Sequence, residues 1–109
     1  MAVIEQRLQI GPDRFRVPDV CVIPAGAKPE SIFRTPPFIC IEVLSPEDRL
    51  PRVLKRLEDY FDFGVPYVFL LDPELKKAWR CTREGLHEVS ELRTENPDTL
   101  VPVADLFDE

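Results

Sequence analysis

The fold is decided by residues 38–71, which read FICIEVLSPEDRLPRVLKRLEDYFDFGVPYVFLL. Two apolar runs, Phe38–Leu44 and Tyr67–Leu71, flank a segment whose apolar residues recur every three or four positions. Apolar runs of this length are typical of buried strands, and the periodicity predicts an amphipathic helix that ends at Phe63, before a capping Gly64. Strand, helix and strand in this order predict a right-handed crossover between two parallel strands of one sheet.

The predicted helix starts near Ser45-Pro46-Glu47-Asp48, in which Asp48 is the candidate N-cap. Pro51 is compatible with a helix only in the first turn. The expected apolar stripe consists of Leu50, Val53, Leu54, Leu57 and Phe61.

The residues before this unit predict strands and a loop. Residues 2–10 and 14–23 alternate loosely between apolar and polar, and Gly11-Pro12-Asp13 between them predicts a tight hairpin turn. Residues 24–37 contain four prolines and little periodicity, which predicts a surface loop.

The residues after the unit predict a second hairpin, formed by 77–82 and 86–90, and an apolar tail, 99–107, that docks on the sheet. Asp72-Pro73 ends the preceding strand as a turn. Together these patterns predict a mixed α/β fold and a single domain over residues 1–109.

Composition excludes several classes of protein. Twenty Asp and Glu against fourteen Lys and Arg give a net charge of −6, which argues against general, charge-driven nucleic-acid binding but leaves room for a local basic patch. Neither a membrane span nor a secretory signal is visible, so we expect a cytoplasmic protein. Three cysteines, Cys21, Cys40 and Cys81, are an odd number, and the first two lie in apolar strands, so we expect free thiols.

Two carboxylates interrupt the apolar strands. Asp19 lies at the entry of one strand and Glu42 in the middle of the next. An ionised carboxylate is costly to bury without a partner, and a shared Mg²⁺ would satisfy both groups, since Mg²⁺ prefers oxygen ligands. The alternative is an ordinary polar pair whose hydrogen bonds are satisfied by protein groups.

Basic side chains on the predicted helix provide further candidates. At 100° per residue, Arg56 lies on the flank of Tyr60, whereas Lys55 lies further round, toward solvent and beside Asp59. The alternative for both is a solvated ion pair with an acid three or four residues away. His87 is expected on the surface, and Tyr67 and Trp79 are expected to pack in the sheet.

Several motifs occur together and in a recognisable order. These are Arg16-Val17-Pro18-Asp19-Val20, Ile41-Glu42-Val43-Leu44-Ser45-Pro46, the helix with Tyr60 followed by Gly64-Val65, and Leu71-Asp72-Pro73. From about residue 6 to the C-terminus, the chain resembles the Uma-type restriction endonuclease family of the PD-(D/E)XK nuclease superfamily. The resemblance implies a restriction-endonuclease-like mixed sheet with a crossover helix, and a metal-dependent endonuclease that hydrolyses DNA phosphodiester bonds.

The resemblance also implies roles for individual residues. Asp19 and Glu42 would be the metal-binding acids, the carbonyl of Val43 a third ligand, and Mg²⁺ or Mn²⁺ the metal. Arg56 occupies the position, four residues before the helix tyrosine, where the family carries a lysine. An arginine binds phosphate but does not act as a base, and Lys55 lies one residue away but about 100° round the helix.

The family usually carries an N-terminal flanking helix, and we expect this chain to lack it. An uncovered sheet face would favour a homodimer. Three readings therefore follow: a working DNA endonuclease that uses Asp19, Glu42 and Arg56 or Lys55, a catalytically inactive relative that serves as a dimerisation or interaction module, and a small binding domain in which both acids pair with arginines.

Overall fold

The computed structural model describes residues 2–4, 6–23 and 32–107 of the 109-residue chain. Within these ranges it contains eleven strands and two helices. They are β1 (Ala2–Ile4), β2 (Arg7–Gly11), β3 (Arg14–Arg16), β4 (Val20–Val22), β5 (Ile32–Phe33), β6 (Ile39–Val43), α1 (Leu50–Phe63), β7 (Tyr67–Asp72), β8 (Lys77–Thr82), β9 (Gly85–Val89), β10 (Glu91–Thr94), β11 (Thr99–Pro102) and α2 (Val103–Leu106).

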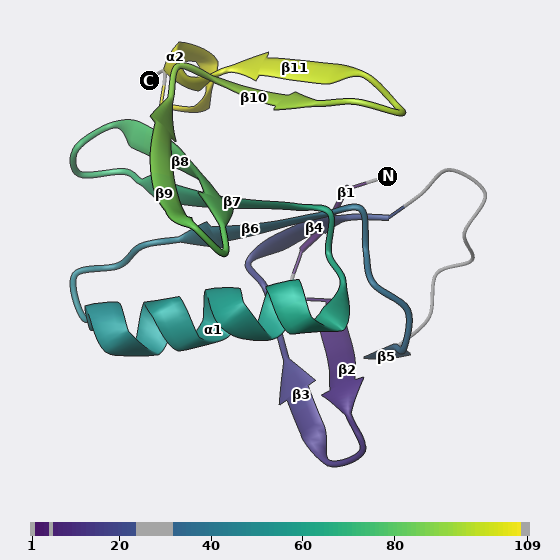
Figure 1. Cartoon of the computed structure of the whole chain (residues 1–109). Helices are drawn as coiled ribbons and strands as arrows, with labels where there is room; N and C mark the ends of the chain where they lie inside the picture. The colour runs from purple at the N-terminus through teal and green to yellow at the C-terminus, as the bar shows by residue number, and fades with distance from the viewer. Residues whose placement is uncertain (1, 5, 24–31, 108–109) are drawn as a thin grey trace.

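The main sheet has the strand order β1-β4-β6-β7-β8-β9. Strands β6 and β7 are parallel, and α1 connects them, which confirms the predicted crossover. The other neighbours in this sheet are antiparallel, so the class is mixed α/β. Figure 1 shows α1 lying along one face of the sheet and the β10–β11 hairpin lying over the other.

The ends of α1 were predicted with unequal success. Gly64 adopts φ 97°, in the left-handed region, and its N–H donates to the carbonyls of Tyr60 and Phe61, so the predicted C-cap is confirmed. The N-cap is Arg49, without a side-chain cap, so the prediction of Asp48 was wrong. Asp48 instead accepts a hydrogen bond from the N–H of Ser45 at 2.8 Å, which closes the turn before the helix.

The buried side of α1 is centred on Val53, Leu57 and Tyr60, which pack against the sheet. The expected stripe was wrong at Leu50 and Leu54, which are 59% and 45% exposed. These two side chains lie on the far flank of the helix, and Leu54 lines an open groove of about 360 Å³ toward β8 and β9. The apolar period therefore identified the helix but misplaced the centre of its buried face.

The N-terminal segments form four strands in two sheets, where two strands were expected. The β2–β3 hairpin turns at residues 12–13 as predicted and, with β5, forms a small sheet beside α1. Strands β1 and β4 pair with each other in the main sheet instead. Strand β5 lies within the predicted 24–37 loop, of which residues 24–31 lie outside the described residues.

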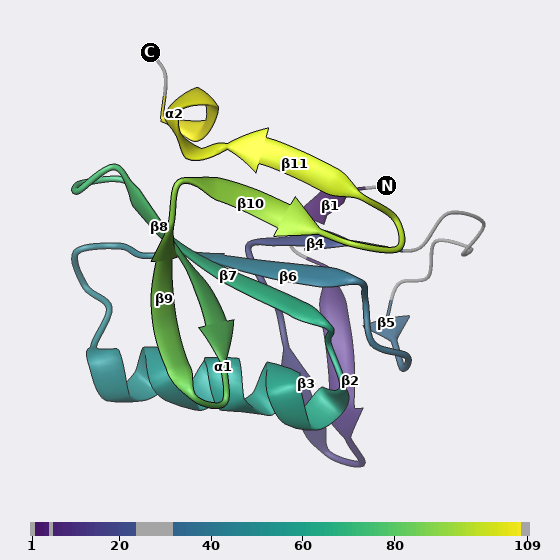
Figure 2. The ribbon, with the colours of Figure 1, turned by 45° about the horizontal axis from the view of Figure 1, so that its top comes forward.

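The second face of the main sheet has its own apolar cluster. The β10–β11 hairpin, which was not predicted, and α2 cover it, as Figure 2 shows, and Leu92 and Val103 are buried there, so the tail docks as expected. This cover corrects the expectation of a bare face. Val22, Ile41 and Val43, on β4 and β6, are only half-buried.

Cys21, Cys40 and Cys81 are free and buried, as expected, and all three belong to the cluster beneath α1. His87 is exposed, and Tyr67 and Trp79 pack against the two core clusters, as predicted. Within the described residues, no helix has the length and apolar character needed to span a membrane.

Candidate active site

The register of the sheet brings the two predicted acids together. Antiparallel pairing of β4 with β6 places Val20 opposite Ile41 and Cys21 opposite Cys40. Extending this register by one residue places Asp19 opposite Glu42. Residues that face each other across antiparallel strands point to the same side of the sheet, and here that is the side covered by α1.

Asp19 is exposed and is oriented by the neighbouring backbone. Its Oδ2 accepts a hydrogen bond from the N–H of Val43 at 2.7 Å. Pro18 precedes it and has no N–H to donate, which helps to end the pairing of the main sheet at this point. The carboxylate of Asp19 is thus fixed beside β6 while it remains open to solvent.

Glu42 is 4% exposed, and its Oε1 accepts a hydrogen bond from the hydroxyl of Tyr60 on α1. Burial raises the pKa of Glu42 to about 7, and the charge of Asp19 adds to the rise, while Tyr60 and the positive charge of Arg56 oppose it. Near neutral pH this carboxyl group therefore binds and releases a proton readily.

Arg56 is half-buried on α1 and its charge acts on Glu42, whereas Lys55 is exposed, as expected. The guanidinium of Arg56 is 3.6 Å from Oδ1 of Asp48, and its Nε is buried without a hydrogen-bond partner among the described residues. The N–H of Ser45 and the charge of Arg56 hold the pKa of Asp48 below its usual range. Arg56 therefore pairs with Asp48, and its buried Nε makes no hydrogen bond to a described residue.

Asp59 was expected near the solvent side of α1, beside Lys55, and this was wrong. Its side chain is buried, with its two oxygens 2.7 Å from Arg14 and 2.6 Å from Arg16. Burial opposes ionisation, but the hydrogen bonds and charges of Arg16 and Arg14 hold the pKa of Asp59 below its usual range. Helical periodicity could not identify this network, because it depends on the β2–β3 hairpin folding over that flank.

The same network bears on the reading in which both acids pair with arginines. Among the described residues, no ion pair joins an arginine to Asp19 or Glu42. The arginines of β3 pair with Asp59 instead, and the two acids bind a backbone N–H and a tyrosine hydroxyl. Tyr60, a partner of Glu42, is the residue that reasoning about charges alone missed.

The carboxyl ends of β6 and β7 border an open cleft of about 670 Å³. Its lining comprises Leu44, Ser45, Pro46, Asp48, Asp72, Pro73 and Glu74. The cleft begins two residues beyond Glu42, and Asp48, which pairs with Arg56, is part of its wall. The candidate site therefore adjoins this cleft, but Asp19 and Glu42, which define the site, are not among the residues that line it.

The donor set fits a hard divalent cation. Two carboxylates lie on one side of the sheet, one solvent-exposed and the other buried with a raised pKa, and a cation would favour the ionised form of both. Among the described residues, no group of three or more His, Cys, Asp or Glu side chains is arranged so that it could hold a metal ion. Mg²⁺ commonly uses only one or two carboxylates together with waters and substrate phosphates, so two acids are sufficient.

The family model described as Uma2, "Putative restriction endonuclease", matches residues 1–108. The chain belongs to the Uma2 family. The expected family resemblance is thereby confirmed over nearly the whole length. No curated protein matches the chain.

Among solved structures, the Uma2-family chain is similar to a crystal structure from Anabaena variabilis, described as a "putative nuclease belonging to DUF820". The TM-score is 0.73 at 22% sequence identity, and the match covers 97% of this chain and 66% of that chain. At this identity the likeness establishes the fold. The chain spans about two thirds of the length of this structural relative.

Proposed function

We propose that this Uma2-family chain is a metal-dependent DNA endonuclease that hydrolyses phosphodiester bonds. The observation that carries the proposal is that Asp19 lies near enough to act on Glu42, with each carboxyl group held by a separate hydrogen bond. Membership of a family described as a restriction endonuclease supports the choice of reaction and substrate.

In this proposal Asp19, Glu42 and the carbonyl of Val43 hold Mg²⁺ or Mn²⁺. Such an ion, when bound, polarises a scissile phosphate and lowers the pKa of a water molecule. The remaining steps belong to the chain's own residues. Val43 orients Asp19 through its N–H, and Tyr60 orients Glu42 through its hydroxyl.

Arg56 takes the role of a phosphate-binding cation. Its fork of N–H donors suits a phosphate, and its positive charge acts on Glu42. An arginine stays protonated, so it stabilises the charge that develops on phosphate oxygens but accepts no proton. Lys55 is exposed on the helix surface and contributes charge rather than a proton transfer.

The assay is cleavage of supercoiled plasmid in Mg²⁺ or Mn²⁺ by wild-type protein, Asp19→Ala and Glu42→Ala, all purified identically. We expect nicking by the wild type and its loss in both variants. Equal nicking by all three proteins would identify a contaminating nuclease and overturn the proposal, as would no nicking by any of them.

The second candidate is a catalytically inactive member of the family that acts as an interaction module. It is favoured by Arg56 standing where the family carries a lysine. An Arg56→Lys variant separates the two candidates, because it restores the family residue without changing the charge. Plasmid cleavage gained by that variant alone would support the second candidate.

We further propose a homodimer and a cytoplasmic location. Val22, Ile41 and Val43 stay half-buried although the β10–β11 hairpin and α2 cover that face, and this supports a dimer, because a second copy would remove the remaining apolar surface from water. Three free thiols suit a reducing compartment. Light scattering at high micromolar concentration tests the dimer, and a monomeric mass would overturn it.

A further inference from the structure

The first two turns of α1 carry positive charge where a helix is least able to accommodate it. The N-cap is Arg49, Arg52, Lys55 and Arg56 follow, and the first turn contains no acidic residue. Exposed N–H groups give a helix N-terminus a partial positive charge, so acids stabilise it and cations destabilise it. The charge pattern therefore opposes helix stability and calls for another explanation.

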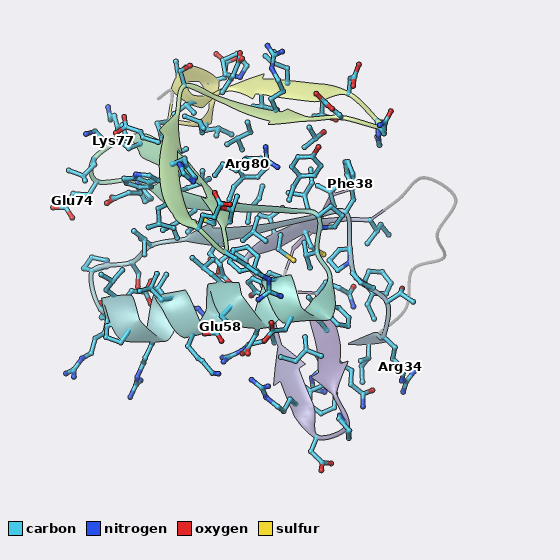
Figure 3. All side chains as sticks on the ribbon, viewed as in Figure 1. Arg34, Phe38, Glu58, Glu74, Lys77 and Arg80 are labelled. Atoms are coloured by element: carbon cyan, nitrogen blue, oxygen red, sulfur yellow. The ribbon has the colours of Figure 1, made fainter. Side chains whose placement is uncertain are left out.

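Three of these cations are unneutralised within the described part of the chain. Arg49, Arg52 and Lys55 are exposed, and none makes an ion pair with a described residue. We call these three residues the basic row. The next acid along α1 is Glu58, which Figure 3 labels on the helix, and Asp59 after it is already paired with Arg14 and Arg16.

The basic row leads to the candidate active site. At 100° per residue, Arg49 and Arg52 lie within about 60° of each other and of Arg56 on one flank of α1, and Lys55 lies about 60° beyond Arg52, so the row spans about 120° of the helix surface. Asp59 lies on the same flank, so Arg14, whose side chain is 55% exposed, borders this surface too. The flank ends at Arg56, whose charge acts on Glu42.

Positive charge is also concentrated in the first half of the chain. Residues 1–56 contain nine Lys and Arg against seven Asp and Glu, whereas residues 57–109 contain five against thirteen. The acidic balance, which argued against charge-driven contact with nucleic acid, therefore comes from the second half. The half that carries both candidate metal-binding acids has a positive balance.

We propose that the basic row binds successive phosphates of a DNA strand and guides that strand to Asp19 and Glu42. From Arg49 to Lys55, the two ends of the row, the helix rises about 9 Å, which corresponds to roughly three nucleotides along a B-form axis. Side chains of this kind contact the backbone without reading bases, so they position the strand but do not select a sequence. The inference rests on the proposed endonuclease function and assigns the contact surface of its substrate.

The test measures binding rather than cleavage. A fluorescent 20-base-pair DNA duplex is titrated with full-length protein in Ca²⁺ at several KCl concentrations, and the slope of log K against log salt is determined. The variant Arg49→Ala/Arg52→Ala/Lys55→Ala is expected to reduce the magnitude of this slope by about 2.7, since each lost phosphate contact removes about 0.9.

The matched control is Lys76→Ala/Arg83→Ala/Arg93→Ala, which removes the same charge from exposed positions in the second half. It is expected to leave the slope unchanged. An equal effect of the two variants would mean that only net charge matters and would overturn the proposal, as would an unchanged slope for the row variant. A row variant with glutamine in place of alanine provides the same measurement if the alanine variant does not fold.

Binding and cleavage separate the two proposals. If the salt-dependence slope falls only in the row variant and no protein cleaves the plasmid, the proposal that the basic row binds DNA is supported and the proposed endonuclease function is overturned. If cleavage depends on metal and on Asp19 but the slope is unchanged in the row variant, the endonuclease function is supported and DNA binding by the basic row is overturned.

Discussion

The hydroxyl of Tyr60 donates a hydrogen bond to Oε1 of Glu42, and this contact joins the buried face of α1 to β6, inside the main sheet. Glu42 is therefore held by a side chain that lies 18 residues away along the chain. The crossover from β6 through α1 to β7 is what brings the two residues together.

Replacing Tyr60 with phenylalanine removes this donor. Because the hydrogen bond lowers the pKa of Glu42, its loss is expected to raise that pKa further and to weaken Mn²⁺ binding at pH 7 by about 10- to 100-fold, as is typical of residues that orient metal ligands. Isothermal titration calorimetry measures the affinity. Tyr67→Phe is the control, because its hydroxyl accepts from the N–H of Glu95 instead. Equal affinities for the two variants would contradict the prediction.

Metal affinity is expected to depend on pH through Glu42. Its pKa is raised to about 7, so below that pH a proton competes with the metal, and the affinity falls as pH falls, by about tenfold per unit. An ordinary glutamate would give an almost constant affinity between pH 6 and pH 8. Titrations at pH 6, 7 and 8 measure the dependence, and a flat profile would show that Glu42 is not a ligand.

Asp59→Asn is expected to lower the free energy of unfolding by about 3 kcal/mol at pH 7, less than for a fully buried pair because Arg14 is partly exposed. The folded-state pKa of Asp59 is lowered, so its contribution is present above the ordinary aspartate pKa and is lost as pH falls through the folded value. Urea unfolding between pH 3 and pH 7 should show the two proteins converging in stability toward acid pH. Asp62→Asn, which removes an exposed pair with Arg83, should change little.

Leu57→Ala is expected to destabilise the protein by about 2–5 kcal/mol, because Leu57 is 2% exposed beneath α1 and its removal leaves a cavity. Leu54→Ala on the far flank should change stability by less than about 0.5 kcal/mol. Thermal or urea unfolding measures both. Similar losses for the two variants would mean that the original periodic stripe, and not the observed one, faces the core.

Much of the fold was predictable because the stretch from β6 to β7 contains its own signals: two apolar runs, a helical period and Gly64 as the cap. The N-terminal half was harder. Pro18 lies between β3, which pairs with β2 in the small sheet, and β4, which pairs with β6 in the main sheet. A single alternating pattern in the sequence is therefore divided between two sheets. The β10–β11 hairpin is short and polar on one side, and its place depends on the apolar face it covers.

For the site, Asp19 and Glu42 were predictable because a carboxylate in an apolar strand requires a partner. The identity of that partner was not, since Tyr60 has the character of a core residue on the helix. Asp59 was misplaced for a related reason. Its environment is created by the β2–β3 hairpin, and a helical wheel contains no information about what folds over each flank.

The three buried thiols have a practical consequence. Cys21, Cys40 and Cys81 lie beneath α1, and burial raises the pKa of each, so in the folded protein they are both shielded and poorly nucleophilic. Their rate of reaction with a thiol reagent therefore reports how often the helix lifts from the sheet. The natural cysteines can therefore be used to measure the opening of α1, the helix whose Tyr60 holds Glu42, without introducing a label.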